Sequence, residues 1–193
     1  AFLFAALNIL EPLYEVCIVR MQEFNQANNR LFVSELQEIA QRYRSNIQYF
    51  IYKSIILRNL YGVDIMVEAT EIAKLRLFLK MVAVVDADRR APNLGLDPLH
   101  DIDFNIRCGN TLVGYATQAE LERGIAFSNL FTAQEFRNKV TEEMEKVARA
   151  YDVFKTIQLR QADDMAAFAG AKGELKARLM ALDELLNRQM YGA

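Results

Sequence analysis

The chain has 193 residues, of which 52% are hydrophobic and 25% are charged. This composition supports a packed core and excludes a globally disordered chain. The net charge of −2 and the pI of about 5.6 argue against a free-standing nucleic-acid-binding domain, which usually carries a basic excess. A larger parent protein could still carry its basic surface elsewhere.

The cysteines and the apolar segments bear on the cellular localisation of the protein. Cys17 and Cys108 lie far apart without C-x-x-C spacing, which indicates neither a disulfide framework nor a zinc site. Asn8, Glu11 and Pro12 interrupt the N-terminal apolar run, so no stretch reaches the roughly 20 apolar residues of a membrane span. The N-terminus also lacks the basic region and cleavage site of a signal peptide. We therefore expect a cytoplasmic protein with no membrane partner, and the oligomeric state stays unknown.

The first part of the sequence predicts helices. Residues 1–10 have the character of a buried helix, and Pro12 suits the first turn of a second helix that ends near Phe24. After a loop, Ser34 and Ser45 each precede a helix-like segment and are candidate N-caps.

The pattern changes at "LYGVDI", residues 60–65, which is short, partly β-branched and therefore strand-like. Residues 68–85 predict a helix with apolar residues on nearly all sides, packed on a sheet. Residues 86–101 predict a loop, and "IDFNIRCGN", residues 102–110, predicts a second strand. These lengths are typical of a βαβ unit, so we expect parallel strands and a right-handed crossover.

Beyond Thr132 the sequence is helical for most of its remaining length. Apolar residues recur every three or four positions from Phe136 to Phe154 and again from Leu175, on either side of "FAGAKG", residues 168–173. This spacing predicts an antiparallel helical hairpin with its break at the glycines. The hairpin carries no chemistry that its sequence reveals, so we expect a scaffold or partner-binding role.

Asp64 is the first candidate for a functional side chain. Ligands of open α/β sheets bind at the carboxyl ends of the strands, and an acid there can accept hydrogen bonds from both hydroxyls of a ribose. Ile65 would then lie flat against an adenine ring. The alternative is that Asp64 caps the helix that begins near Glu68, and spacing alone does not decide between the two.

The second candidate is the segment "IRCGNTLVGY", residues 106–115. Gly109 allows the backbone to turn sharply after a strand. Asn110 offers a donor and an acceptor, which suit the amino group and ring nitrogen of an adenine. A plain Gly-Asn turn explains the same two residues.

Together these segments resemble adenine-specific DNA methyltransferases, most closely the large fused type IIG restriction–modification enzymes and related phage-defence methylases. Residues 59–83 look like motif II of that family, and residues 101–115 look like motif III. The opening "AFLFAALNILEPLYE" is similar to the end of motif I, which reads approximately D-P-A-C-G-S-G-A-F-L in the family. The resemblance covers residues 1–20 and 46–116 and is weak elsewhere.

The resemblance implies a fold and a domain organisation. The fold would be α/β and mostly helical, a partial Rossmann-like methyltransferase core with few parallel strands and a helical hairpin. Residues 1–116 would form the core, with a helical segment at 21–58. Residues 117–193 would form a helical insertion between motif III and the catalytic motif.

The resemblance also implies a cofactor and its ligands. The cofactor would be S-adenosylmethionine, with its ribose held by Asp64 and its adenine packed on Ile65. Asn110 would contact the amino edge of the adenine, and Ala1, Phe2 and Leu3 would border the methionine part. No metal site is implied.

The implied reaction is methyl transfer from S-adenosylmethionine to the exocyclic amine of adenine in DNA, in restriction–modification or phage defence. The family's N-P-P-Y or D-P-P-Y motif stacks on a flipped-out base, and this chain has three prolines with no two adjacent. The glycine loop is absent as well. We therefore expect an internal fragment of a DNA-binding parent, inactive by itself and without a catalytic residue.

Two residues depart from the family pattern. Met66 stands where the family often has a second acid or an asparagine. Asn110 stands where many methyltransferases have an aspartate, so it can form hydrogen bonds but brings no charge.

Other polar residues are weaker candidates. His100 is the only histidine and lies in a proline-flanked loop, so a surface role is expected. The carboxylates of "DADRR" and "DPLHDID" are explained by a solvated loop better than by a metal site. Arg42 and Arg44, on either side of Tyr43, could contact phosphate, but a solvated helix face explains them more simply.

Two other function classes fit the sequence less well. An NAD-binding fragment would need G-x-G-x-x-G about 20 residues before the acid, and no glycine precedes Gly62. A non-enzymatic helical interaction module would explain residues 132–193 but leaves the βαβ segment without a purpose.

Overall fold

The computed structural model describes residues 2–27, 30–90, 101–113, 117, 119–120, 123, 130–160 and 164–191. The chain divides into two compact units. The α/β unit comprises Ala1–Leu96 and Asp101–Leu112, and the hairpin unit comprises Asp97–His100 and Val113–Ala193.

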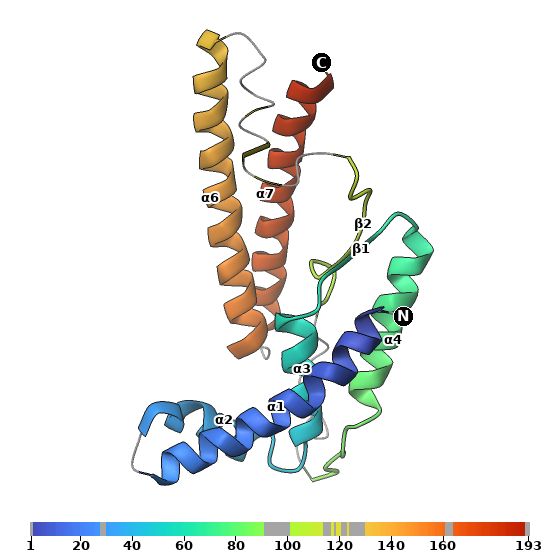
Figure 1. Ribbon diagram of the computed structural model, residues 1–193, viewed down its shortest axis with the longest axis vertical. Coiled ribbons are helices and arrows are strands. Elements are labelled where there is room, and N and C mark those ends of the chain that lie inside the picture. The colour runs from blue at the N-terminus through green and yellow to red at the C-terminus, as the bar shows by residue number, and fades with distance from the viewer. Residues whose placement is uncertain are drawn as a thin grey trace. The chain divides into compact units, whose positions relative to one another are not determined.

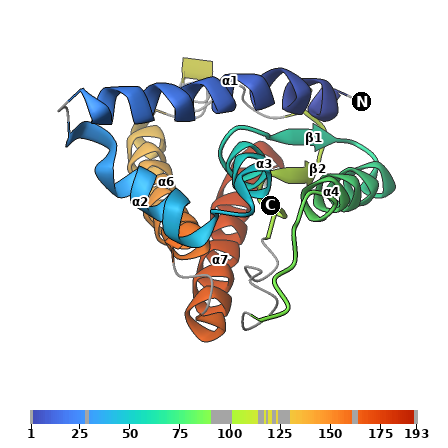
Figure 2. The same cartoon turned by 90° about the horizontal axis from the view of Figure 1, so that it is seen from below.

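The α/β unit contains four long helices and two strands. Its elements in chain order are α1 (Phe2–Gln26), η1 (Arg30–Phe32), α2 (Val33–Arg42), α3 (Ile47–Arg58), β1 (Gly62–Asp64), α4 (Val67–Val82) and β2 (Ile106–Cys108). Helix α3 packs against both α1 and α4, and α4 contacts both strands (Figures 1 and 2).

The core of the α/β unit is centred on α3. Apolar residues surround this helix on all sides, and a helix of that kind is stable only when it is buried. Eight of its residues are buried, among them Ile51 and Ile55. The buried core consists of Leu7, Ile18, Ile39, Tyr43, Tyr49, Ile51, Tyr52, Ile55, Ile56, Leu60, Leu77, Met81 and Ile106.

The two strands are parallel, as the sequence predicted, and pair Gly62 with Ile106 and Asp64 with Cys108. Both strands are shorter than expected. The predicted first half of the second strand forms a turn instead, because the backbone nitrogens of Asn105 and Ile106 both donate to Ile102 O at 3.0 Å. The fold is thus mostly helical with two parallel strands, in agreement with a partial α/β fold.

Helix α1 is continuous, whereas the sequence predicted two helices that meet at Pro12. Proline removes one backbone hydrogen bond inside a helix, but one side of α1 faces the core along its whole length. Leu7 and Ile18 are buried on that side, and between them Tyr14 OH donates to Asn59 Oδ1 at 2.6 Å. The helix expected over residues 1–10 is therefore present, but it is buried on one side only.

Among the described residues, α1 is long and apolar enough to cross a membrane, contrary to the expectation that no stretch is. Core helices of soluble proteins and signal sequences share this property. The contacts of α1 are those of a packed helix, because Glu11 Oε1 accepts hydrogen bonds from Tyr52 OH at 2.8 Å and from Gln48 Nε2 at 3.2 Å. The absence of a membrane partner stays a prediction.

Neither serine predicted as an N-cap has that role. Ser34 lies inside α2, where its Oγ donates to Glu35 Oε2 at 2.8 Å. The N-cap of α3 is Asn46 rather than Ser45. Asn46 Nδ2 donates to Asp86 O at 3.0 Å, and Asp86 N donates to Asn46 Oδ1 at 2.7 Å, so this side chain joins two segments instead of capping a helix.

Helix α4 buries one side rather than its whole circumference. Thr70, Leu77 and Met81 face the core, and the contacts of α4 with both strands confirm that it packs on the sheet. Its outer side exposes four apolar residues at helical spacing: Ile72, Leu75, Leu79 and Val82.

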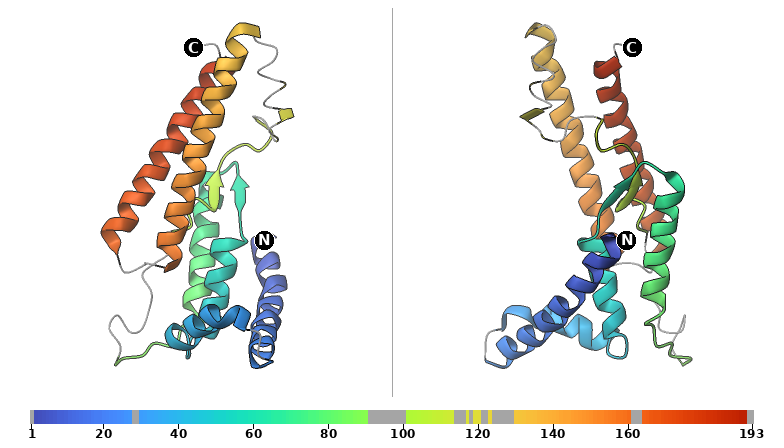
Figure 3. Two further views of the ribbon diagram at one scale, coloured as in Figure 1. Left: turned by 90° about the vertical axis from the view of Figure 1, so that its left-hand side faces the viewer. Right: turned by 45° about the vertical axis from the view of Figure 1, so that its right-hand side comes forward.

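The hairpin unit contains α6 (Leu130–Arg160) and α7 (Met165–Tyr191), which run antiparallel and in contact (Figure 3). The predicted break at "FAGAKG" is wrong, because α7 continues through Gly170 and Gly173. A glycine inside a helix costs roughly 1 kcal/mol relative to alanine. Packing on both sides of the glycines offsets that cost, since Phe168 lies 5.5 Å from Phe154 between ring centroids and Leu175 is buried.

Candidate functional site

The parallel pairing of β1 and β2 brings the two candidate segments to one edge of the sheet. Asp64 is the last residue of β1 and is paired with Cys108, the last residue of β2. Gly109 N then donates to Asp64 O at 2.9 Å, which extends the pairing by one residue. Asn110 therefore leaves the sheet beside the strand end that carries Asp64.

The Asp64 carboxylate is exposed and only partly engaged. Its Oδ1 accepts a hydrogen bond from Met66 N at 2.9 Å, a local turn that leads into α4. The N-cap of α4 is Met66, so Asp64 is not the N-cap that the alternative interpretation required. Among the described residues no hydrogen bond to Asp64 Oδ2 is present, so this oxygen can accept from a ligand.

Asn110 forms the same kind of local turn. Its Oδ1 accepts a hydrogen bond from Leu112 N at 2.9 Å. An amide oxygen has two lone pairs and the amide nitrogen two hydrogens, so both remain able to contact a ligand. The turn interpretation is therefore correct for the backbone and does not exclude a binding role.

Gly109 does not have the role that the sequence suggested. Its φ lies outside the left-handed region that favours glycine, and an added Cβ would come 3.5 Å from Val63 Cγ1, an ordinary contact. The turn at this position is made by the Asn110 side chain, and glycine is not needed for it.

Exposed apolar side chains surround the end of β1. Ile65 is 68% exposed, and Val63, Met66 and Val67 are more than half exposed. Clusters of exposed apolar residues mark surfaces that bind ligands or partners. An apolar surface next to a carboxylate and an amide suits a ligand with a flat apolar part and several hydroxyl or amino groups.

Phe2 and Leu3, expected to border the methionine part, lie at the N-terminal end of α1. Ala1 is outside the described residues, and Phe2 is 92% exposed. Leu3 packs on the sheet, since its Cδ1 lies 3.4 Å from the position of a Cβ on Gly62. The start of α1 thus lies beside β1 at Gly62, which is two residues before Asp64.

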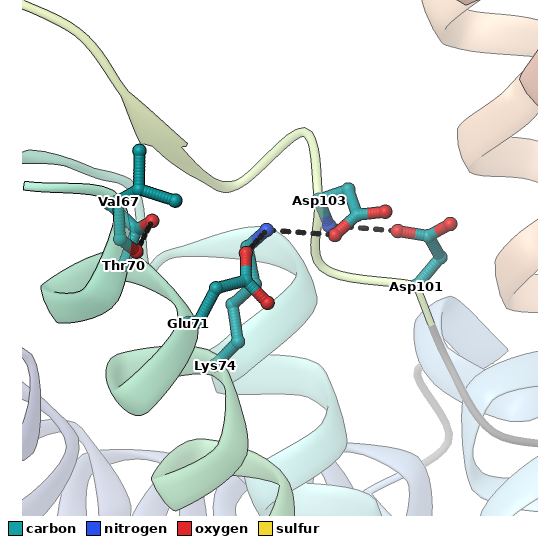
Figure 4. Close-up of polar contacts among 6 residues, drawn as sticks. All are labelled: Val67, Thr70, Glu71, Lys74, Asp101 and Asp103. Atoms are coloured by element: carbon teal, nitrogen blue, oxygen red, sulfur yellow. Dashed lines mark hydrogen bonds and ion pairs between the residues drawn. The ribbon is translucent and has the colours of Figure 1, made fainter.

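Lys74 fixes the turn before β2 to α4 (Figure 4). Its Nζ lies 2.8 Å from Glu71 Oε1 and 2.9 Å from Asp103 Oδ1, and Asp103 N donates to Asp101 Oδ1. Burial lowers the pKa of Lys74, but the hydrogen bonds to Glu71 and Asp103 outweigh it and hold the pKa above its ordinary value. This ion pair positions the second strand rather than a ligand.

The weaker candidates stay predictions where the structure does not test them. Tyr43 is buried and accepts a hydrogen bond from Lys53 Nζ at 2.8 Å, so Arg42 and Arg44 are separated by a core residue. His100 lies outside the described residues. Cys17 and Cys108 are free and exposed, and no group of three potential metal ligands is present in the part of the chain that the structure describes.

Sequence reasoning missed the polar residues that hold the site in place. Asn105 is buried at the start of β2, and Glu11 bonds Tyr52 between α1 and α3. Burial and then the hydrogen bond to Glu11 raise the pKa of Tyr52. The available signal was a polar residue inside an apolar segment, which is costly to bury unless it has a partner.

The comparison with known proteins gives a partial relative. No protein-family model and no solved structure matches the chain. The chain is similar to a Methanocaldococcus jannaschii protein named "Putative type II restriction enzyme and methyltransferase", with 36% identity over 118 residues. The match covers 56% of this chain and 10% of that protein, so the chain spans about a tenth of the relative's length. At this coarse level the chain is similar to restriction–modification methyltransferases.

Proposed function

We propose that the chain is part of a site-specific DNA adenine methyltransferase of a restriction–modification or phage-defence system, and that its strand-end edge holds the adenosine of S-adenosylmethionine. One observation carries the proposal: parallel strand ends bring the Asp64 carboxylate and the Asn110 amide to one exposed edge beside Ile65. The similarity to a protein named as a restriction enzyme and methyltransferase supports it.

The geometry fits the chemical groups of adenosine. Asp64 Oδ2 accepts a hydrogen bond from a ribose hydroxyl, and Ile65 offers an apolar surface to the flat face of the base. The Asn110 amide can donate to a ring nitrogen and accept from the amino group. S-adenosylmethionine would supply an activated methyl group, and this chain would bind and orient its adenosine end.

The rest of the reaction would lie in other segments of a parent protein. The chain has no adjacent prolines and therefore no N-P-P-Y motif to receive a flipped-out adenine. In this proposal the parent binds the DNA in the cytoplasm, and the isolated chain transfers no methyl group. The hairpin unit would serve as an inserted scaffold or partner-binding element.

An NMR titration of the isotope-labelled chain with S-adenosylmethionine tests the proposal. We expect weak binding, weaker than micromolar, because the glycine loop is absent. The backbone signals of Asp64, Ile65, Gly109 and Asn110 should all shift, and their shifts should fit a single dissociation constant. A titration in which these signals stay fixed, or in which others shift instead, would refute the adenosine site.

Asp64→Asn is the sharpest variant because the introduced amide keeps an oxygen for Met66 N. It removes the charge and one acceptor, so affinity should fall by about tenfold, the value of one hydrogen bond to a charged group. Asp88→Asn is the matched control, since Asp88 Oδ1 makes the same turn with Arg90 N at 2.9 Å away from the strand ends. Equal losses in the two variants would show that Asp64 has only a turn-forming role.

A further inference from the structure

Asn105 joins three parts of the α/β unit at the start of β2. Its side chain is buried, with 5% exposed. The Nδ2 atom lies 3.2 Å from Ile56 O, 3.3 Å from Leu57 O and 3.1 Å from Leu60 O, at the C-terminal end of α3. Its backbone oxygen accepts a hydrogen bond from Gly62 N at 2.8 Å, where β1 begins.

The side-chain contacts of Asn105 satisfy carbonyl groups that α3 leaves without partners. The last carbonyls of a helix have no intrahelical donor. Here the amides of Asn59 and Leu60 both donate to Ile55 O, so the carbonyls that follow it need donors from elsewhere. Because all three neighbours of the Asn105 amide are acceptors, the nitrogen must face them, and no carboxylate or apolar side chain can replace it.

The strand register needs such a fixed point because the ladder is short. Only three residue pairs join β1 and β2. A slip by one residue would move Asn110 by about 3.3 Å relative to Asp64 and turn each side chain of the slipped strand to the opposite face. The bond from Gly62 N to Asn105 O fixes the register at one end, and the bond from Gly109 N to Asp64 O reports it at the other.

We propose that Asn105 is a positioning residue that sets the register of β1 and β2 and so brings Asp64 and Asn110 to the same edge. It contributes to ligand binding without touching the ligand. The consequence for adenosine rests on the proposed function, whereas the register does not.

The experiment compares Asn105→Asp with Ile39→Ala, a buried α2 variant that destabilises the α/β unit away from the strands. Residue-resolved amide hydrogen exchange is measured for Gly62, Gly109 and the amides of α1 and α3. In Asn105→Asp, the protection of Gly62 and Gly109 should fall by about tenfold or more relative to the helix amides, the effect of losing buried hydrogen bonds. In Ile39→Ala all these amides should lose protection together.

A rescue by pH separates positioning from a general loss of stability. The introduced carboxyl has no donor when ionised and regains one when protonated. The protection of Gly109, corrected for intrinsic exchange, should therefore recover as the pH falls through the pKa of that carboxyl. Should Asn105→Asp not fold at neutral pH, Asn105→Ser, which keeps one donor, provides the same comparison with a smaller expected loss.

The ligand arm is read separately. The S-adenosylmethionine concentration that half-saturates the shift of the Asp64 signal should be about tenfold higher in Asn105→Asp than in Ile39→Ala, because the register is lost. Selective loss of Gly109 protection without ligand-dependent shifts in the unmodified chain would refute the proposed function and uphold the register role. Gly109 protection that falls only in proportion to the helix amides would refute the role of Asn105.

Discussion

In the described residues, side-chain hydrogen bonds of the α/β unit join segments far apart in the sequence, whereas the ion pairs of the hairpin unit join residues three or four positions apart on one helix. The hydrogen bonds between Asn46 and Asp86 and between Tyr14 and Asn59 span 40 and 45 residues. In the hairpin unit, Arg178 and Glu174 are typical, as an ion pair four residues apart on one helix. A single side chain of the α/β unit can therefore join segments far apart in the sequence, and we expect the geometry of that unit to depend on such side chains.

Removing one buried side chain from each unit should give the largest effects. Ile55 is fully buried in α3, and Leu175 is 1% exposed in α7. Large-to-small changes in cores cost about 2–5 kcal/mol, and the cost is higher where the surroundings cannot collapse. Helices α1 and α4 enclose α3 on two sides, so a cavity at Ile55 cannot collapse easily. In the hairpin unit, α6 and α7 can move together and fill a cavity at Leu175. We expect Ile55→Ala to destabilise its unit more than Leu175→Ala destabilises the hairpin.

Residue-resolved hydrogen exchange measures each unit with its own amides, because the most protected amides report unfolding of the unit to which they belong. Ile55→Val and Leu175→Met serve as controls, since they change shape or volume far less. A larger loss for Leu175→Ala than for Ile55→Ala would contradict the comparison.

Alkaline pH should also destabilise the two units to different extents, with a smaller effect than the core substitutions. Burial raises the pKa of Tyr14 above its ordinary 10.0, burial and Glu11 raise that of Tyr52, and the pKa of Lys74 lies above its ordinary 10.5. A raised pKa means that the folded state binds the proton more tightly. The resulting stability is complete below the ordinary value and is lost as the pH rises through the folded pKa, so the α/β unit should weaken above about pH 10.

The shifted groups of the hairpin unit predict a smaller alkaline effect. Lys146 has a raised pKa through Glu142 and Glu143, and Glu142 has a lowered pKa through Lys146, but Glu142 is exposed and Lys146 is only half-buried. The lowered pKa of Glu142 adds stability above its ordinary 4.5, which is lost in acid. Urea unfolding at pH 8 and pH 11, followed by the methyl signals of each core, measures the difference. Tyr52→Phe should reduce the stability that the α/β unit loses between pH 8 and pH 11. An unchanged loss would show that Tyr52 does not contribute to it.

The elements of both units were largely predictable, because hydrophobic spacing determines them locally. The end of β1 at Asp64 and the parallel partner strand followed from the change of period and from the lengths of the segments. Wrong boundaries arose where packing outweighed a local signal. Pro12 lies inside a helix because Leu7 and Ile18 are buried on either side of it, and Gly170 does so because the half-buried Phe168 and the buried Leu175 flank it.

The contacts that position the candidate site were not predictable from local sequence. Asn105 contacts carbonyls of residues more than 40 positions earlier, and Asn46 contacts Asp86 at a similar separation. No periodicity encodes such pairs, because one polar residue can find its partner anywhere in the chain. The turns at Asp64 and Asn110 are local, because in each a side-chain oxygen accepts from the backbone nitrogen two residues later.

The smallest expected effect lies in the surface ion pairs of the hairpin unit. Arg178 Nε donates to Glu174 Oε1 at 2.7 Å, and both side chains are exposed. Exposed pairs of this spacing contribute about 0.3–0.5 kcal/mol. Arg178→Gln should therefore lower the free energy of unfolding of the hairpin by a few tenths of a kcal/mol in dilute buffer. The difference should vanish near 1 M salt, where charges are screened beyond about 3 Å.

Glu174→Gln is the matched control and should give the same small, salt-sensitive loss. A salt-independent loss above about 1 kcal/mol, the net value of a typical hydrogen bond, would show that the hairpin also depends on single side chains.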